Sequence, residues 1–140
     1  MTDVVKIRSA DGSATLEFAV TERTEERIAF AASYSSNDFQ GSVLSSTYLT
    51  EPPSRFFAAL ASDWKNERAW QDLERAVKLR TKSDSTGHVT LYVELTNHDA
   101  RRSLSGFVVL ELGQLDAIAA AMRAAFGFET IDEHSAWTRK

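Results

Sequence analysis

The stretch that decides the fold runs from Asp84 to Phe126. It reads DSTGHVTLYVELTN (84–97), HDARR (98–102), SLSGFVVLEL (103–112) and GQLDAIAAAMRAAF (113–126). Apolar and polar residues alternate over 88–96, which is the period of a strand with one buried face. The mixed pattern over 104–112 predicts a second strand that is buried on both faces. Apolar residues at helical spacing over 114–126 predict an amphipathic helix after it.

The same period of two recurs in the sequence on the N-terminal side of this stretch. It predicts five further strands, over residues 4–8, 15–21, 27–34, 39–48 and 76–83. Asp11-Gly12 separates the first two, and this dipeptide favours a tight hairpin because Gly tolerates positive φ. Gly41, inside the fourth of the five, indicates a bulge or a close approach of the backbone. The connections are too short for parallel crossovers, so we expect antiparallel pairing.

A helix is predicted to begin at Thr50-Glu51-Pro52-Pro53. Thr50 is a suitable cap, and prolines are tolerated in the first helical turn. An apolar stripe at helical spacing continues to Trp64. Trp70 and Leu73 are out of phase with that stripe, so a separate turn or short helix is predicted there.

These elements predict one α+β domain over residues 1–140. We expect a single antiparallel sheet of about six to seven strands with two amphipathic helices packed on one face. The tail, residues 128–140, is mostly polar, and we expect it to be loosely ordered.

Composition and charge narrow the class of function. The net charge is −4 and the pI is near 5.4, whereas general nucleic-acid binders usually carry a basic excess. No apolar stretch approaches the ~20 residues of a membrane span. The N-terminal residues lack the pattern of a signal peptide. The chain has no cysteine, which fits a reducing compartment. We therefore expect a cytoplasmic protein that binds neither nucleic acid nor membranes.

The sequence contains no recognisable catalytic or metal-binding constellation. His88 and His98 flank a predicted strand of about nine residues, so they lie about 30 Å apart and cannot share a metal ion. His88 follows the turn Asp84-Ser85-Thr86-Gly87, where we interpret it as a turn or strand-start residue. A catalytic or ligand role for His88 is the alternative. We expect no catalytic residue, no cofactor and no metal site.

The basic row Lys78, Arg80 and Lys82 is the most informative surface feature. On a strand, all three side chains share one face. One interpretation is an edge strand protected by its charge. The other is a docking surface for an acidic partner, continued by Thr90 and Tyr92 if the two strands pair in register.

Residues Gly87–Leu95 and Val108–Ala119 also carry a family resemblance. They resemble a family of small, mostly uncharacterised bacterial proteins that are similar in layout to WapI-type immunity proteins of polymorphic toxin systems. The resemblance covers nearly the whole chain, most firmly residues 50–126. It implies no catalytic set, and it implies a protein partner of the toxin kind.

The first hypothesis is therefore a non-enzymatic binding protein, with an immunity-like role in which it neutralises a toxin by direct contact as its more specific form. The first alternative is a small-molecule-binding or regulatory domain with a cleft between sheet and helices. The second alternative is a hydrolase with a non-obvious acid/base pair. A weak homodimer is compatible with each of the three.

Overall fold

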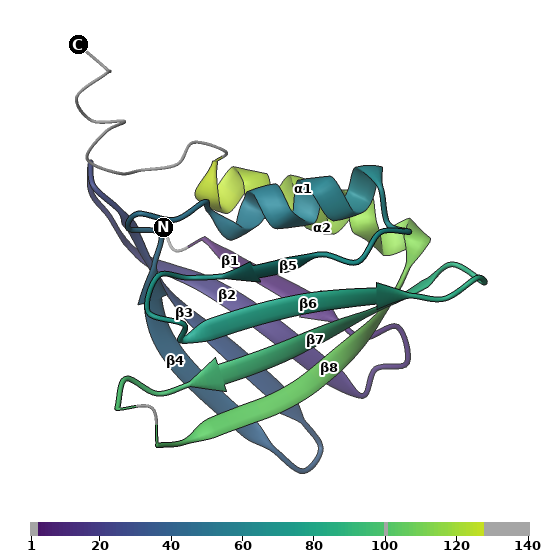
Figure 1. Cartoon of the computed structure of the whole chain (residues 1–140), viewed down its shortest axis with the longest axis horizontal. Helices are drawn as coiled ribbons and strands as arrows, with labels where there is room; N and C mark the ends of the chain where they lie inside the picture. Colours follow the sequence, from purple (N-terminus) through teal and green to yellow (C-terminus); the bar gives the residue numbers. More distant parts are fainter. Residues whose placement is uncertain (1–2, 100, 128–140) are drawn as a thin grey trace.

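The computed structural model describes residues 3–99 and 101–127, in which two antiparallel sheets and two helices form (Figure 1). The first sheet has the order β1 Val4–Arg8, β2 Ala14–Arg23, β3 Ile28–Ser36, β4 Gln40–Ser46. The second has the order β5 Ala69–Gln71, β6 Val77–Ser83, β7 His88–Thr96, β8 Ser103–Glu111. Helix α1, Pro53–Ser62, connects the two sheets, and α2, Leu112–Phe126, follows β8.

The core lies between the two sheets and under the helices. In Figure 1 the second sheet crosses in front of the first, and α1 and α2 lie side by side along one side of both. The ring of Phe18 on β2 contacts Phe57 of α1 and Phe126 of α2, each at 6.2 Å between centroids. The largest fully buried side chains come from both sheets and both helices: Phe18, Phe30, Phe57, Ile7, Leu16, Leu60, Leu79, Leu91, Leu110, Met122, Val77 and Val89.

The prediction of an α+β protein is confirmed, but the single sheet of about six to seven strands is wrong. The chain forms two four-stranded sheets, and the helices close one side of a sandwich rather than cover one face. The alternation in each strand shows which residues are buried, but it does not show what buries them. Here the apolar faces of both sheets and of both helices share one core.

Two local predictions also fail. Trp70 lies in β5, where it pairs with Leu79, and not in a turn or a short helix, whereas Leu73 does lie in a turn, between β5 and β6. Its indole N–H donates to the carbonyl of Glu51 at 2.8 Å, which fixes β5 beside the start of α1. Thr50 does not cap α1, because the helix is preceded by Pro52 and the Thr50 hydroxyl donates to the carbonyl of Gln71.

Gly41 does mark a close approach, as one of its two interpretations proposed. A Cβ atom at this position would lie 3.1 Å from Cδ1 of Leu104 on the other sheet. The irregularity in strand pairing falls elsewhere, between Val20 and Glu22 of β2.

Tyr34 joins the two sheets at the free edge of β8. Its hydroxyl donates to the carbonyl of Phe107 at 3.0 Å and accepts the N–H of the same residue at 3.3 Å. Further along β8, the N–H of Ala10 donates to the Val109 carbonyl at 2.7 Å. The Val109 N–H in turn donates to Ser9 Oγ at 3.0 Å. Backbone groups that would otherwise be unpaired at this edge are therefore satisfied by the first sheet.

The C-terminal end of α2 is held by both neighbouring elements. Arg23 at the end of β2 donates to the carbonyl of Ala125, and Ser54 of α1 donates to the carbonyl of Gly127. The last carbonyls of a helix lack partners inside the helix, so these side chains supply them.

At Gly106, where Tyr34 of the first sheet contacts β8, there is no space for a side chain. A Cβ atom there would overlap the Tyr34 ring and lie 2.7 Å from its hydroxyl oxygen. We predict that Gly106→Ala lowers the free energy of unfolding by about 1–3 kcal/mol, the usual cost of overpacking. Urea denaturation followed by tryptophan fluorescence measures this loss.

The matched control is Gly113→Ala in the first turn of α2, where an added Cβ has no heavy atom within 4 Å. Alanine favours a helix over glycine, so this variant should gain up to about 1 kcal/mol. Equal stability of the two variants would contradict the role assigned to the Tyr34–Gly106 contact.

Candidate functional site

The basic row lies on the outer face of the second sheet, on strand β6. Alternation along this strand points Val77, Leu79 and Thr81 into the core. It leaves Lys78 half-buried and Arg80 and Lys82 exposed on the opposite face. The sequence therefore predicted the common face of these three cations correctly.

β6 is an inner strand of the sheet, flanked by β5 and β7. Beyond the end of β5 its backbone is still covered, because the Thr81 N–H donates to the carbonyl of Arg68 at 2.8 Å. The interpretation of the basic row as protection of an edge strand is therefore wrong, since β6 has no free edge to protect.

The register of β6 and β7 extends the row in the way that the docking interpretation required. Arg80 pairs with Tyr92, and Lys82 pairs with Thr90. The Arg80 guanidinium carbon lies 4.6 Å from the centroid of the Tyr92 ring, a cation–π distance. The Tyr92 ring lies 6.4 Å from that of Phe107 on β8. We call the line Arg80, Tyr92, Phe107 the Arg–aromatic ladder; it crosses three neighbouring strands.

The cations of this face differ in their partners. Lys78 Nζ lies 3.6 Å from Oε1 of Glu94, directly across the β6–β7 pair. Arg80 and Lys82 form no ion pair with any residue in 3–99 or 101–127. Two positive charges on this face are thus available to a partner, although the chain as a whole carries −4.

A hollow of about 430 Å³ opens beside the ladder on the same face. The short side chains of Ala69 and Ser105 stand next to long ones and leave this space. Its lining residues belong to all four strands of the sheet: Ala69, Trp70, Gln71, Lys78, Leu79, Arg80, Tyr92, Val93, Glu94, Ser105 and Gly106. A cation above an aromatic ring, next to a hollow, suits a carboxylate or a planar group of a partner molecule.

Phe107 belongs to this face, and the sequence interpretation missed it. We expected its strand to be buried on both sides, but the Phe107 side chain is 50% exposed. The signal was present in Ser103, Ser105 and Phe107, which alternate with more buried residues. This signal was not decisive, because the neighbouring residues Val109 and Leu110 lie on opposite faces of the strand and are both apolar.

His88 lies away from the hollow, in the turn before β7. The Asp84 carboxylate accepts the N–H groups of Thr86 at 2.8 Å and of His88 at 3.0 Å. The Thr86 hydroxyl lies 2.8 Å from that carboxylate and 2.9 Å from Nδ1 of His88. These bonds confirm the predicted turn over 84–87. A role of His88 beyond the turn stays untested.

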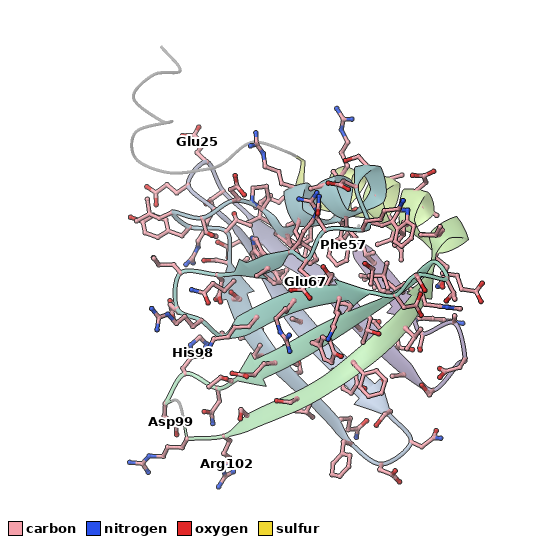
Figure 2. The ribbon with its side chains drawn as sticks, turned by 45° about the vertical axis from the view of Figure 1, so that its right-hand side comes forward. Glu25, Phe57, Glu67, His98, Asp99 and Arg102 are labelled. Carbon is pink, nitrogen blue, oxygen red and sulfur yellow. The ribbon has the colours of Figure 1, made fainter. Side chains whose placement is uncertain are left out.

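His98 is not brought to this turn. His98 lies past the opposite end of β7, where Figure 2 shows it with Asp99 and Arg102 at the β7–β8 connection. Its Nδ1 is 3.3 Å from Oε2 of Glu74. His134 and the rest of the tail, 128–140, lie outside the described residues. In 3–99 and 101–127 no group of three or more His, Asp and Glu side chains is placed to hold a metal ion.

No helix in the described part of the chain is both long enough and apolar enough to cross a bilayer.

The fold and this face define a small α+β protein of two antiparallel meanders with an exposed Arg–aromatic ladder. Residues 7–129 match the model of a family of unknown function, DUF6228. The chain belongs to this family, so the expectation of an uncharacterised family is confirmed. No curated protein and no solved structure matches the chain.

The Asp84 turn gives a prediction for acid titration. The N–H of His88 and then the hydroxyl of Thr86 hold the pKa of Asp84 at about 2, below its ordinary value of 3.8. A depressed pKa stabilises the folded state above pH 3.8, and this stabilisation is lost as the pH falls toward about 2. We predict a carboxyl ¹³C NMR titration midpoint near pH 2 for Asp84.

Asp84→Asn is the matched control, because it removes the titrating group from the turn. The free energy of unfolding of this variant should fall less than that of the wild type between pH 4 and pH 2. A wild-type midpoint at the ordinary value would show that the turn does not hold the charged carboxylate.

Proposed function

We propose that the protein is a non-enzymatic binding protein that docks an acidic protein partner on the outer face of β5–β8. The observation that carries the proposal is the Arg–aromatic ladder Arg80, Tyr92, Phe107 beside a hollow of about 430 Å³. Arginine and aromatic residues are the side chains most enriched at the energetic centres of protein interfaces.

The charges favour an acidic partner. Arg80 and Lys82 have no ion pair among the described residues, and they lie on a protein whose total charge is −4. A locally basic face on an acidic protein orients an acidic partner during encounter and disfavours contact elsewhere. Lys78 and Glu94 add a polar rim beside the ladder.

We further propose an immunity-like role, in which contact with a bacterial toxin in the cytoplasm neutralises it. The support is the resemblance carried by Gly87–Leu95 and Val108–Ala119 to proteins similar in layout to WapI-type immunity proteins. Inhibition by contact requires a complementary surface and no catalytic groups. The exposed Arg–aromatic ladder supports this proposal as a candidate contact surface.

A small-molecule-binding role is the second candidate, and the same hollow favours it. About 430 Å³ lies within the range of ligand pockets, roughly 300–1,000 Å³. This hollow is on the outer face of the sheet, whereas a cleft between sheet and helices was expected. Between sheet and helices, the side chains of Phe57, Leu60 and Met122 are buried in the core.

Charge reversal tests the proposed surface. The variant Lys78→Glu/Arg80→Glu/Lys82→Glu should lose a protein that the wild type captures from its native host. Binding of the purified partner, measured by calorimetry, should weaken about 100-fold, because buried interface cations typically contribute several kcal/mol. In the immunity-like case, co-expression of the wild type should relieve the partner's toxicity, and the variant should not.

The matched control is Lys6→Glu/Arg8→Glu, which reverses cations on β1 of the other sheet. Circular dichroism checks that both variants keep the fold. If the two variants lose the partner equally, the outer face of β5–β8 is not the docking site. If only small molecules from a metabolite panel raise the melting temperature, and the triple variant abolishes that shift, the second candidate is favoured.

A further inference from the structure

Three of the four sheet edges in the described part of the chain have a side chain or another element against their outer side, each in a different way. Strand β1 packs near α2, and the Gln114 side chain donates to the Arg8 carbonyl at 2.9 Å. Strand β5 has only three residues, and the Thr50 hydroxyl reaches its Gln71 carbonyl. The edge of β8 is satisfied by Tyr34 and by Ser9–Ala10.

Strand β4 is the fourth edge, and its backbone groups on the side away from β3 are unpaired within the described residues. The Ser36 N–H donates to the Phe39 carbonyl, and the Thr47 N–H donates to the Ile28 carbonyl. Hydrogen-bonded positions alternate along an antiparallel pair, so β4 bonds to β3 through its odd-numbered residues. The N–H and C=O groups of the even-numbered residues therefore point away from β3: Gln40, Ser42, Leu44 and Ser46. No residue in 3–99 or 101–127 forms a backbone hydrogen bond with these groups on that side.

The usual devices that prevent edge-to-edge pairing are absent from β4. The segment QGSVLSS contains no charged residue and no proline, although charged residues make up 26% of the chain. Its pairing with β3 is regular over seven positions, without a bulge. Leu44 on the outer face is 61% exposed. Such an edge is a template for another strand.

We propose that β4 pairs antiparallel with β4 of a second copy of the chain, about a two-fold axis beside Leu44. In this register Leu44 lies opposite Leu44 of the second copy, and Ser42 lies opposite Ser46. The outward N–H and C=O groups of Ser42, Leu44 and Ser46 then meet those of Ser46, Leu44 and Ser42 of the second copy. The two first sheets join into one continuous sheet of eight strands, twice the four of one copy.

A second copy is the occupant that the edge itself favours. Two uncharged strands approach without repulsion, although two whole molecules each carry −4. On the outer face, Val4, Ala19, Ala31 and Leu44 form one cross-strand row of apolar side chains. The proposed register continues this row across the axis, so that the exposed Leu44 gains an apolar cross-strand neighbour. A two-fold pairing uses the same edge of both copies, so it ends at an isologous dimer.

Cysteine cross-linking tests the register directly, because the chain has no cysteine of its own. Paired residues at a hydrogen-bonded position have Cα atoms about 5.5 Å apart, within the range of a disulfide. We predict that oxidation by copper phenanthroline converts Leu44→Cys into a covalent dimer on a non-reducing gel. Val4→Cys is the matched control: it is 44% exposed in the same row but at the opposite edge of the sheet, and it should stay monomeric.

Sedimentation velocity supplies the second measurement. The wild type should dimerise with rising concentration, and Leu44→Lys should weaken dimerisation about tenfold or more, because two like charges then face each other. Val4→Lys should leave dimerisation unchanged. So should the triple reversal of Lys78, Arg80 and Lys82, since the proposed partner surface is on the other sheet. The failure of one proposal therefore does not imply failure of the other.

Three results would overturn the β4 pairing. The first is a wild type that stays monomeric at its highest soluble concentration. The second is a dimer that survives Leu44→Lys and leaves Leu44→Cys unlinked, which would place the interface elsewhere. The third is a monomer that binds uncharged strand-forming peptides at β4, which would assign this edge to a foreign strand.

Discussion

The contact of Tyr34 with the backbone of β8 is the constraint on which the rest of the molecule depends. An antiparallel meander ends in two strands with unpaired backbone groups, and this chain contains two meanders. The Tyr34 hydroxyl both donates to and accepts from Phe107, so one side chain satisfies two backbone groups of the second sheet. Its ring occupies the space that the missing side chain of Gly106 leaves. This contact fixes how closely the two inner faces approach, and hence the thickness of the core.

Because the inner faces of the two sheets face each other, their outer faces remain exposed. These two outer faces carry different kinds of side chain. The outer face of the second sheet carries the Arg–aromatic ladder and the hollow. The outer face of the first sheet carries mostly small side chains, and its strand β4 has the unguarded edge. The two faces lie on opposite sides of the sandwich, so binding on one leaves the other accessible. The proposed pairing at β4 and the proposed docking on β5–β8 are therefore compatible with each other.

The sequence predicted the strands well and their assembly poorly. Alternation in β7 correctly gave its inward residues, and the register of Arg80 with Tyr92 was as required by the docking interpretation. Division into two sheets was not predictable from the same signal. Alternation reports burial but not the neighbour, and α1 between β4 and β5 is equally compatible with one sheet or with two.

Trp70 was misassigned because a three-residue strand is too short to show a period. Phe107 was missed because its exposure depends on which face of β8 the first sheet covers. The described residues do not include 128–140, so the expected order of that tail stays a prediction.

The connectivity of the two sheets has a consequence for the order of folding. Within each sheet, every strand pairs with the strand that precedes or follows it in the chain. Such pairings close short loops, which form quickly and cost little chain entropy. The contacts that join the first sheet to the second sheet and to α2 are far apart in sequence: 73 residues for Tyr34–Phe107, 100 for Ser9–Val109 and 102 for Arg23–Ala125. During synthesis, the first meander is complete before β5 exists. The first sheet can therefore form with an apolar face that is not fully covered until the second sheet and the last helix have been made.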